Sequence, residues 1–158
     1  MSAFREVRRR DRAVAEDDAR EILARADYGA LATAGADGWP YAVPVNHVLA
    51  GDIVYLHCAQ QGHKLDNIAH DERVCYCAVA SAEVLPKELA MLYESAIVFG
   101  RAAIVTDSVE RRRAMELLAA RFCGCITPEA EREIAKDGPR TVIVRIRIER
   151  ITGKARRK

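Results

Sequence analysis

Three apolar runs in the first half of the chain, residues 28–34, 39–49 and 53–58, follow one another with only short turns between them. Gly35-Ala36-Asp37-Gly38 separates the first two runs, and Gly51-Asp52 separates the last two. Strands joined by connections this short pair antiparallel, because a parallel pair needs a crossover of a dozen or more residues. The spacing therefore predicts an antiparallel sheet.

Pro44 lies within the second run and cannot donate a hydrogen bond to a neighbouring strand. We expect this strand to be interrupted near Pro44 or to lie at the edge of the sheet. Either arrangement leaves backbone groups free to meet a ligand.

Further strands are predicted over residues 73–80, 93–105 and 142–149. The last has the clearest alternation, with Val142, Val144, Ile146 and Ile148 on the face expected to enter the core. Residues 93–105 are apolar on both faces for part of their length, as barrel staves or subunit-interface strands are, and Gly100 favours a bulge or bend. Residues 81–92 lack a clear pattern and are assigned to a loop with room for helical turns.

Helical spacing of apolar residues predicts an amphipathic helix over residues 16–26 and another that starts near Asp107, whose carboxylate can cap it. The buried stripe of the second is expected to be Ala114, Met115, Leu118 and Phe122. Shorter helices are predicted over residues 63–70 and from Thr127-Pro128 onward. About six strands with a few helices between them predict a mainly β fold with flanking helices (α+β), closed or partly closed into a barrel, because closure removes exposed strand edges.

Length and charge limit the remaining classes. The chain has 158 residues, half of them hydrophobic, which suits one domain over residues 1–158. Lys and Arg total 25 against 23 Asp and Glu, so nothing favours nucleic acid as a partner. No run approaches the roughly 20 apolar residues of a membrane span, and the start of the chain is polar, so we expect a cytoplasmic protein.

The cysteines point to reduced thiols. They form an odd set of five in a chain without an export signal, which argues against a disulfide framework. A zinc site built from Cys75 and Cys77, or from Cys123 and Cys125, with His57 or His70 is conceivable. Zinc sites favour C-x-x-C spacing, however, and buried cysteine is common as a small hydrophobe, so we expect no metal.

Residues 57–67 have the features of an anion site. A strand ends in small residues, Gly62 lets the backbone approach a ligand, and the N–H groups of the following helix point to the same place. Lys64 adds a positive charge in the first turn, where the helix dipole disfavours it, and a phosphate would balance that charge. Taken alone, Gly62-His63-Lys64 fits an ordinary surface loop equally well.

Ordered matches elsewhere extend this pattern. They are DIVYLHCA (52–59), GHKLDNI (62–68) and VCY (74–76), with RRRDR (8–12), YAVPVN (41–46), LP (85–86), YESAIVFGRA (93–102) and ITGKA (151–155) on either side. In this combination the chain resembles the pyridoxamine 5'-phosphate oxidase-related FMN-binding proteins, especially their nitroimidazole-resistance branch. Nearly the whole chain is covered, and several motifs in register are more specific than any one of them.

The resemblance implies a flavin-reductase-type, FMN-binding split β-barrel that forms a homodimer with FMN at the subunit interface. It assigns the FMN phosphate and ribityl chain to Cys58, Ala59, Gly62, His63 and Lys64, with Asn67 supporting them. It places the isoalloxazine ring beside Pro44, Val45 and Asn46, where freed backbone groups can bond its polar edge. Ser95 would come from the partner subunit.

His57 ends the third strand, and a strand-end histidine in related proteins lies close to the flavin ring. Facing the ring, His57 could donate a proton to a substrate or position it, because histidine titrates near neutral pH. The alternative is a hydrogen-bonded packing histidine.

The function that follows is an FMN-dependent oxidoreductase that reduces a small electron acceptor such as a nitro-aromatic compound. Three alternatives remain open: a non-catalytic flavin-binding or sensing module, a true pyridoxamine 5'-phosphate oxidase, and a haem-binding split barrel with His57 or His63 as axial ligand. The oxidase would require a second phosphate site and arginine-rich motifs, which the sequence does not show.

Overall fold

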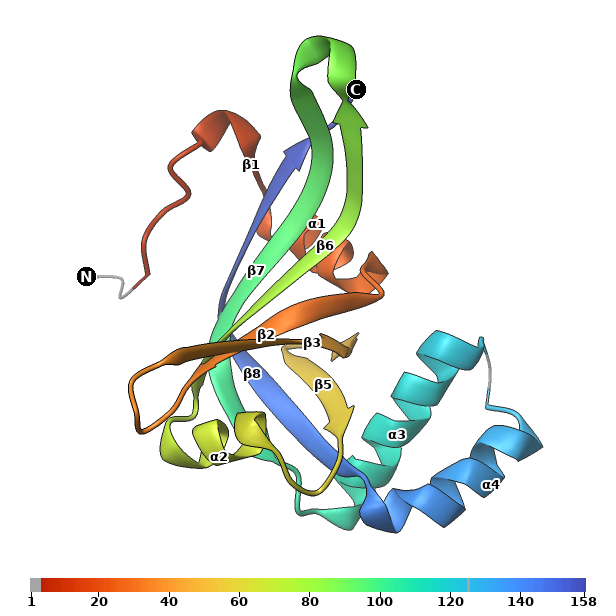
Figure 1. Ribbon diagram of the computed structural model, residues 1–158. Helices are drawn as coiled ribbons and strands as arrows, with labels where there is room; N and C mark the ends of the chain where they lie inside the picture. Colours follow the sequence, from red (N-terminus) through yellow and green to blue (C-terminus); the bar gives the residue numbers. More distant parts are fainter. Residues whose placement is uncertain (1–3, 125) are drawn as a thin grey trace.

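One antiparallel sheet forms most of the protein, as the computed structural model shows for residues 4–124 and 126–158 (Figure 1). Its strands are β1 (Ala13–Val14), β2 (Tyr28–Ala34), β3 (Pro40–Asn46), β4 (Val48–Ala50), β5 (Ile53–Cys58), β6 (Arg73–Leu85), β7 (Ala90–Ile104) and β8 (Val142–Arg156). The helices are α1 (Glu16–Arg25), α2 (His63–His70), α3 (Ser108–Cys123) and α4 (Pro128–Asp137), with 3-10 turns η1 (Arg10–Arg12), η2 (Pro86–Glu88) and η3 (Gly138–Arg140). The strand order is β3-β2-β6-β7-β8-β5-β4, and β1 pairs with β8.

The two edges of this sheet are joined by a single residue. β3 is one edge strand and β4 is the other, and only His47 separates them in the chain. Consecutive Cα atoms are about 3.8 Å apart, so the edges meet within roughly 7.6 Å at this point. The sheet must therefore curl until its edges touch, and the fold is the mainly β split barrel with flanking helices that the sequence predicts.

The inside of the curl holds the main hydrophobic core. α1 contributes Ala19, Ile22 and Leu23 to it, and α2 contributes Leu65 and Ile68, each at the helical spacing that places apolar residues on one face. Strand residues complete the cluster, among them Leu31, Val54, Leu56, Tyr76, Val98, Val144 and Ile146. The alternation predicted for β8 is confirmed, because Val144 and Ile146 are buried while Arg145 and Arg147 are exposed.

A second, smaller core lies on the other face of β5 and β8, where α3 packs. Tyr55 and Ile143 meet Ala114 and Leu118 there. The predicted cap of α3 is confirmed, since Asp107 Oδ1 accepts a hydrogen bond from the amide of Glu110 at 2.7 Å. The prediction that Phe122 completes the buried stripe is wrong. This side chain is 42% exposed and does not belong to the core formed by α3, β5 and β8.

The prediction that the strand containing Pro44 lies at an edge of the sheet is confirmed, whereas the limits predicted for the strands need correction. β3 runs through Pro44, which pairs with Ala30, and the break falls at His47; the strand does lie at an edge, where the missing N–H of proline costs no ladder bond. Residues 81–92 are not a loop, because β6 continues to Leu85 and β7 begins at Ala90. The exposed hairpin they form extends beyond both cores, so burial imposes no alternation on its sequence (Figure 1).

The predicted irregularity at Gly100 is confirmed. The β7–β8 register shifts between Phe99 and Gly100. A Cβ atom at Gly100 would lie 2.3 Å from the carbonyl oxygen of Arg147, so only glycine permits this approach of the two strands.

No helix in the described part of the chain combines the length and the apolar character needed to cross a membrane.

Candidate functional site

The start of α2 presents exposed backbone amides. Gly62 is the N-cap and has a φ of +146°, a conformation that other residues rarely adopt. The Leu65 amide donates to the Gly62 carbonyl at 2.8 Å, so the amides of His63 and Lys64 precede the first hydrogen bond of the helix. Both are directed out of the helix start, which is the arrangement that binds anions.

Lys64 adds a cation at the same place. Its side chain is half-buried, and its charge reaches Cys58 at the end of β5: burial raises the pKa of the Cys58 thiol, and Lys64 opposes that shift. Among the side chains that the structure describes, no carboxylate forms an ion pair with Lys64. A positive charge held beside free amides, with no acidic partner in the described chain, favours an anionic ligand.

His63 connects this helix start to the edge strand β3. Its ring lies 4.1 Å from the ring of Tyr41, centroid to centroid. Further along β3, Val45 packs against the main core, whereas Pro44 and Asn46 are exposed. The structure therefore brings the predicted phosphate residues and one end of β3 together, with the Pro44–Asn46 segment further along the same strand.

Asn67 connects α2 to strand β2. It is buried, and its Nδ2 donates to the hydroxyl of Thr33 on β2 at 3.0 Å. A Cβ atom at Gly35 would lie 2.6 Å from the Asn67 Oδ1, so the end of β2 also lies against this side chain. Asn67 anchors α2 to the sheet, and its predicted support of a phosphate site stays a prediction.

His57 points to the opposite face of β5 from Cys58. It pairs with Ile143, which belongs to the second core, whereas Cys58 packs against the main core. His57 is exposed at a hollow of about 270 Å³ beneath α3 and α4. Strand alternation alone would have predicted this separation of neighbouring residues.

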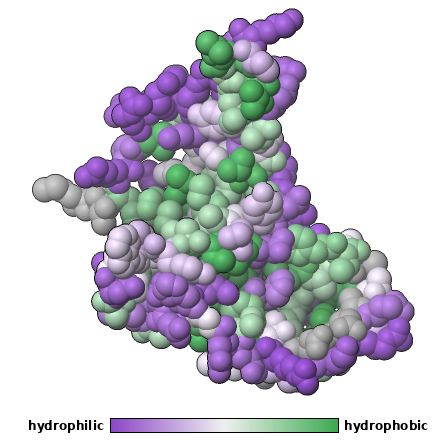
Figure 2. Space-filling model, in the orientation of Figure 1, coloured by the Kyte–Doolittle hydropathy of each residue, from purple (hydrophilic) through white to green (hydrophobic). Residues whose placement is uncertain are grey.

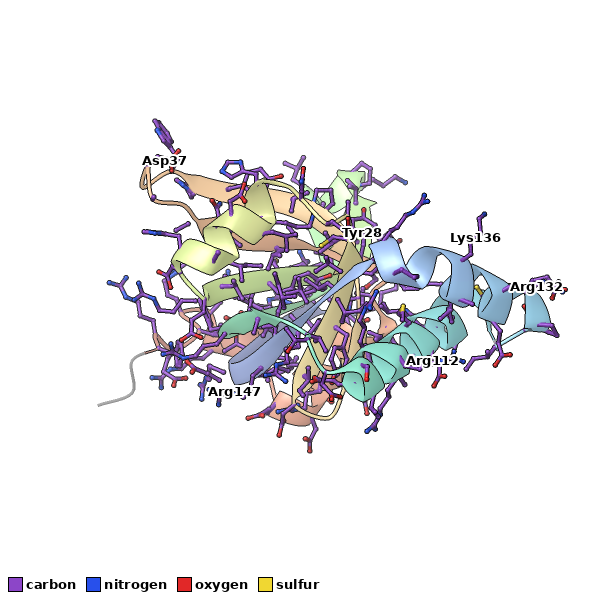
Figure 3. All side chains as sticks on the ribbon, turned by 90° about the horizontal axis from the view of Figure 1, so that it is seen from below. Tyr28, Asp37, Arg112, Arg132, Lys136 and Arg147 are labelled. Atoms are coloured by element: carbon purple, nitrogen blue, oxygen red, sulfur yellow. The ribbon has the colours of Figure 1, made fainter. Side chains whose placement is uncertain are left out.

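The hollow is mostly apolar. Its helix-derived lining consists of Met115, Leu118, Ala119, Phe122 and Ile134. Arg111 of α3 donates hydrogen bonds to the carbonyls of Gly138 and Thr141, which lie at its border. In Figure 3 the labelled charged side chains of this helix pair, Arg112, Arg132 and Lys136, point away from the body of the protein.

Ser95 does not join the other predicted residues within one chain. It pairs with Val79 and Lys154, on the part of β7 away from α2. Val79 lies six residues beyond Arg73, where β6 begins shortly after α2, so at about 3.3 Å per residue the separation is roughly 20 Å.

Sequence reasoning missed the buried pair His47 and Tyr76. His47 Nε2 donates to the Leu23 carbonyl at 2.7 Å, and Nδ1 lies 2.9 Å from the Tyr76 hydroxyl oxygen. The Tyr76 hydroxyl donates to the Val45 carbonyl at 2.9 Å. Burial lowers the pKa of His47 and raises that of Tyr76 well above its usual range. The sequence signal for this position is a lone histidine within the apolar run 39–49.

The cysteines form no metal centre among the described residues, where no group of three or more potential ligands is found. Burial raises the pKa of the Cys75 and Cys77 thiols, which makes them poor nucleophiles. Cys123 is exposed at the end of α3, and Cys125 lies outside the described residues.

Comparison with known proteins shows the family to which the chain is similar. Residues 15–155 match the family model described as pyridoxamine 5'-phosphate oxidase. None of the curated proteins matches the chain.

Solved structures with the same fold share about a fifth of the sequence. The conserved hypothetical protein Rv2991 of Mycobacterium tuberculosis is 21% identical, with a TM-score of 0.81 over 95% of this chain and 90% of that one. An FAD and haem binding protein of Mycobacterium smegmatis is 21% identical, with a TM-score of 0.77 over 91% and 72%. A candidate 5-nitroimidazole antibiotic resistance protein of Bacteroides thetaiotaomicron is 20% identical, with a TM-score of 0.71 over 90% and 85%. At such identities the similarity establishes the fold.

Proposed function

The chain belongs to the pyridoxamine 5'-phosphate oxidase family, and from this membership we propose that it is a flavoprotein that binds FMN at the start of α2. The structural neighbour from Mycobacterium smegmatis is described as binding FAD and haem, which supports a flavin ligand for this fold. The choice of FMN rests on the geometry of the phosphate site.

The observation that carries the proposal is the donor set at residues 62–64. A terminal phosphate needs several donors and a positive charge, and the His63 and Lys64 amides with the Lys64 ammonium group provide both. Gly62 adds no side chain that would obstruct the ligand, and no atom lies within 4 Å of the position of its missing Cβ. These residues fit the phosphate of FMN, and Cys58 and Ala59 lie next to them at the end of β5.

The ring of the flavin would lie beside Pro44, Val45 and Asn46. β3 is an edge strand, so one side of its backbone has no neighbouring strand within the chain. Such groups can hydrogen-bond the polar edge of an isoalloxazine ring. The Asn46 amide is held in place by its hydrogen bond to the Asp27 carbonyl at 3.0 Å.

A second copy of the chain would complete the site. Over β2, β6 and β7, no described helix covers the sheet face opposite α1, whereas α3 covers that face at β5 and β8. Hydrophobic residues gather over the middle of the sheet (Figures 1 and 2). Strand pairing places small and apolar side chains together on this face: Ala30, Cys75, Cys77, Ile97 and Phe99. Ser95 lies on the same face. We therefore propose a homodimer in which Ser95 of one subunit approaches the flavin of the other.

The reaction would be reduction of a small acceptor such as a nitro-aromatic compound. Conversion of a nitro group to a nitroso group takes two electrons and two protons and releases water. Bound flavin supplies the two-electron chemistry, with a nicotinamide dinucleotide as the source of electrons. His57, exposed at the hollow, would hold a proton at a ring nitrogen for the acceptor.

The absorption spectrum of the purified protein tests the cofactor class. A band near about 450 nm is expected for flavin, whereas a Soret band would identify haem and contradict the proposal. Stopped-flow mixing with NADH or NADPH and then with nitrobenzene tests turnover. If the bound flavin is neither reduced by the nicotinamide nor reoxidised by nitrobenzene, the proposed reductase activity is contradicted, and the protein is a flavin-binding module without catalysis.

Substitution of Lys64 tests the phosphate site. Lys64→Ala should weaken FMN binding about 10- to 100-fold, which corresponds to about 1–3 kcal/mol for a lost charge-assisted hydrogen bond. Quenching of flavin fluorescence measures the dissociation constant. Lys87→Ala, which removes an exposed lysine in η2, is the matched control and should leave it unchanged. Equal affinity in both variants would place the phosphate elsewhere.

A further inference from the structure

The hollow beneath α3 and α4 has no role in holding the flavin phosphate, because it lies on the opposite face of β5 from Cys58. It is nevertheless connected to the phosphate site. Gln60, in the loop before Gly62, donates a hydrogen bond from Nε2 to the Pro139 carbonyl at 3.2 Å. Pro139 follows Gly138, which borders the hollow. A molecule in the hollow would therefore lie next to the loop that begins the phosphate site.

The size and lining of the hollow favour one small aromatic molecule. A dry apolar cavity of about 150 Å³ is enough to bind benzene. This hollow of about 270 Å³ is open to solvent on one side, and it has room for one ring with a substituent but not for a nucleotide. Met115, Leu118 and Phe122 form an apolar wall, and Phe122 leaves 42% of its surface exposed.

Polar groups in the hollow are few. His57 projects from β5 and is the only titratable side chain among its described lining residues. The nearby Arg111 guanidinium is occupied by the carbonyls of Gly138 and Thr141. An anionic or phosphorylated ligand would thus find no free arginine or lysine in this lining, whereas a neutral group that accepts one hydrogen bond would find His57.

We propose that this hollow binds a neutral aromatic molecule whose nitro or carbonyl oxygen accepts a hydrogen bond from His57. This binding site goes beyond the proposed function and does not rest on it. The binding of this molecule does not depend on the flavin, so the two proposals can be tested separately.

Nitrobenzene is a suitable probe, and toluene is a control probe of similar shape that accepts no hydrogen bond. Titration of the purified protein by NMR should show saturable binding of nitrobenzene with a shift of the His57 ring signals. Toluene should bind more weakly, and His57→Phe should remove the difference between the two compounds. Equal affinities for both compounds in the unmodified protein would contradict the role of His57.

Filling the hollow tests its location. Ala119→Phe should weaken nitrobenzene binding at least tenfold, whereas Ala120→Phe, at the next position on α3 and outside the lining, should not change it. If Ala119→Phe does not fold, Met115→Ala enlarges the hollow and should shift the preference toward 1-nitronaphthalene. Unchanged binding in Ala119→Phe, or an unchanged preference in Met115→Ala, would overturn the proposal.

Lys64→Ala separates the two proposals. It should lose FMN affinity and still bind nitrobenzene. Unchanged FMN affinity in Lys64→Ala would contradict the flavin site alone, and absent nitrobenzene binding in the unmodified protein would contradict the hollow alone.

Discussion

At the scale of single residues, His47 connects more elements of the fold than its position in a short connection would indicate. It is 1% exposed, and it is the only residue between the two edge strands of the sheet. Both ring nitrogens are engaged, one by the Leu23 carbonyl and the other by the Tyr76 hydroxyl. These contacts therefore join α1, the crossover and β6 at one point, and burial of the ring disfavours its charged form.

This arrangement makes the stability of the protein depend on pH. Burial is the main cause of the lowered pKa of His47, and the nearby Arg121 acts in the same direction, while the Leu23 carbonyl and Asp27 oppose it. Below the ordinary histidine pKa of 6.5, the unfolded chain takes up a proton that the folded chain does not. The free energy of unfolding should therefore fall as the pH drops through 6.5, by at most about 1.4 kcal/mol per pH unit from this residue.

Urea denaturation at pH 7.5 and pH 5.5 measures the effect. His47→Gln, which keeps a side-chain donor, should be less stable at pH 7.5 and should lose part of the pH dependence. If the variant keeps the full dependence of the unmodified protein, other groups are responsible for it.

Residues of the candidate site differ in how far the sequence predicts them. Gly62, His63 and Lys64 act through the backbone and charge of a helix start, which local sequence specifies, and the structure brings them together. The direction of His57 could have been derived from the alternation of β5. The His47–Tyr76 pair could not, because it depends on the curl of the whole sheet.

At the scale of elements, the first turn of α2 can face solvent and a ligand because the later residues of the helix are anchored to the main core and to β2. Leu65 and Ile68 enter the main core, and Asn67 holds the hydroxyl of Thr33. The helix has only the residues His63–His70, too few to be stable alone, so its position depends on these contacts.

Paired variants test this anchoring. Asn67→Ala removes the bond to Thr33 and should lower the free energy of unfolding by about 1–3 kcal/mol. Asp107→Ala removes the cap of α3 and should lower it by about 1 kcal/mol. Only Asn67→Ala should also weaken FMN binding, because the proposed phosphate site lies at the start of α2. Calorimetry and flavin titration, both at a temperature where each variant is folded, measure the two effects; equal FMN affinity in the two variants would contradict a positioning role for Asn67.

Most elements were predictable because their patterns are local. The limits of β2, β5 and α2 follow from alternation, turns and the glycine before the helix. The hairpin made by the end of β6 and the start of β7 was missed because Ser81 and Val84 are both exposed, so no burial distinguishes one face from the other. Its strands are specified by pairing with each other and with β8, which no local window contains.

At the scale of the whole molecule, the uncovered face of the sheet predicts the assembly. Ile97→Arg places a charge in the middle of that face and should convert the proposed dimer into a monomer, because an unpaired buried charge is costly. Light scattering during size-exclusion chromatography measures the mass. Val109→Arg, at a 75% exposed position on α3, is the control and should leave the mass unchanged. A monomeric mass for the unmodified protein would contradict the dimer.

The overall fold was predictable as an antiparallel barrel, since short connections permit few other arrangements. The sequence does not reveal which strand becomes central. β8 pairs with β1, β5 and β7, so it links segments that are far apart along the chain.

The central position of β8 has a consequence during synthesis on the ribosome. β5 and β7 do not pair with each other, because β8 lies between them. Until residues 142–156 have left the exit tunnel, the nascent chain exposes the strand edges that β8 will cover, and no earlier element can complete the barrel. Contacts of such large sequence separation also slow folding. For this protein, the period between the emergence of β5 and that of β8 is when a chaperone is most needed.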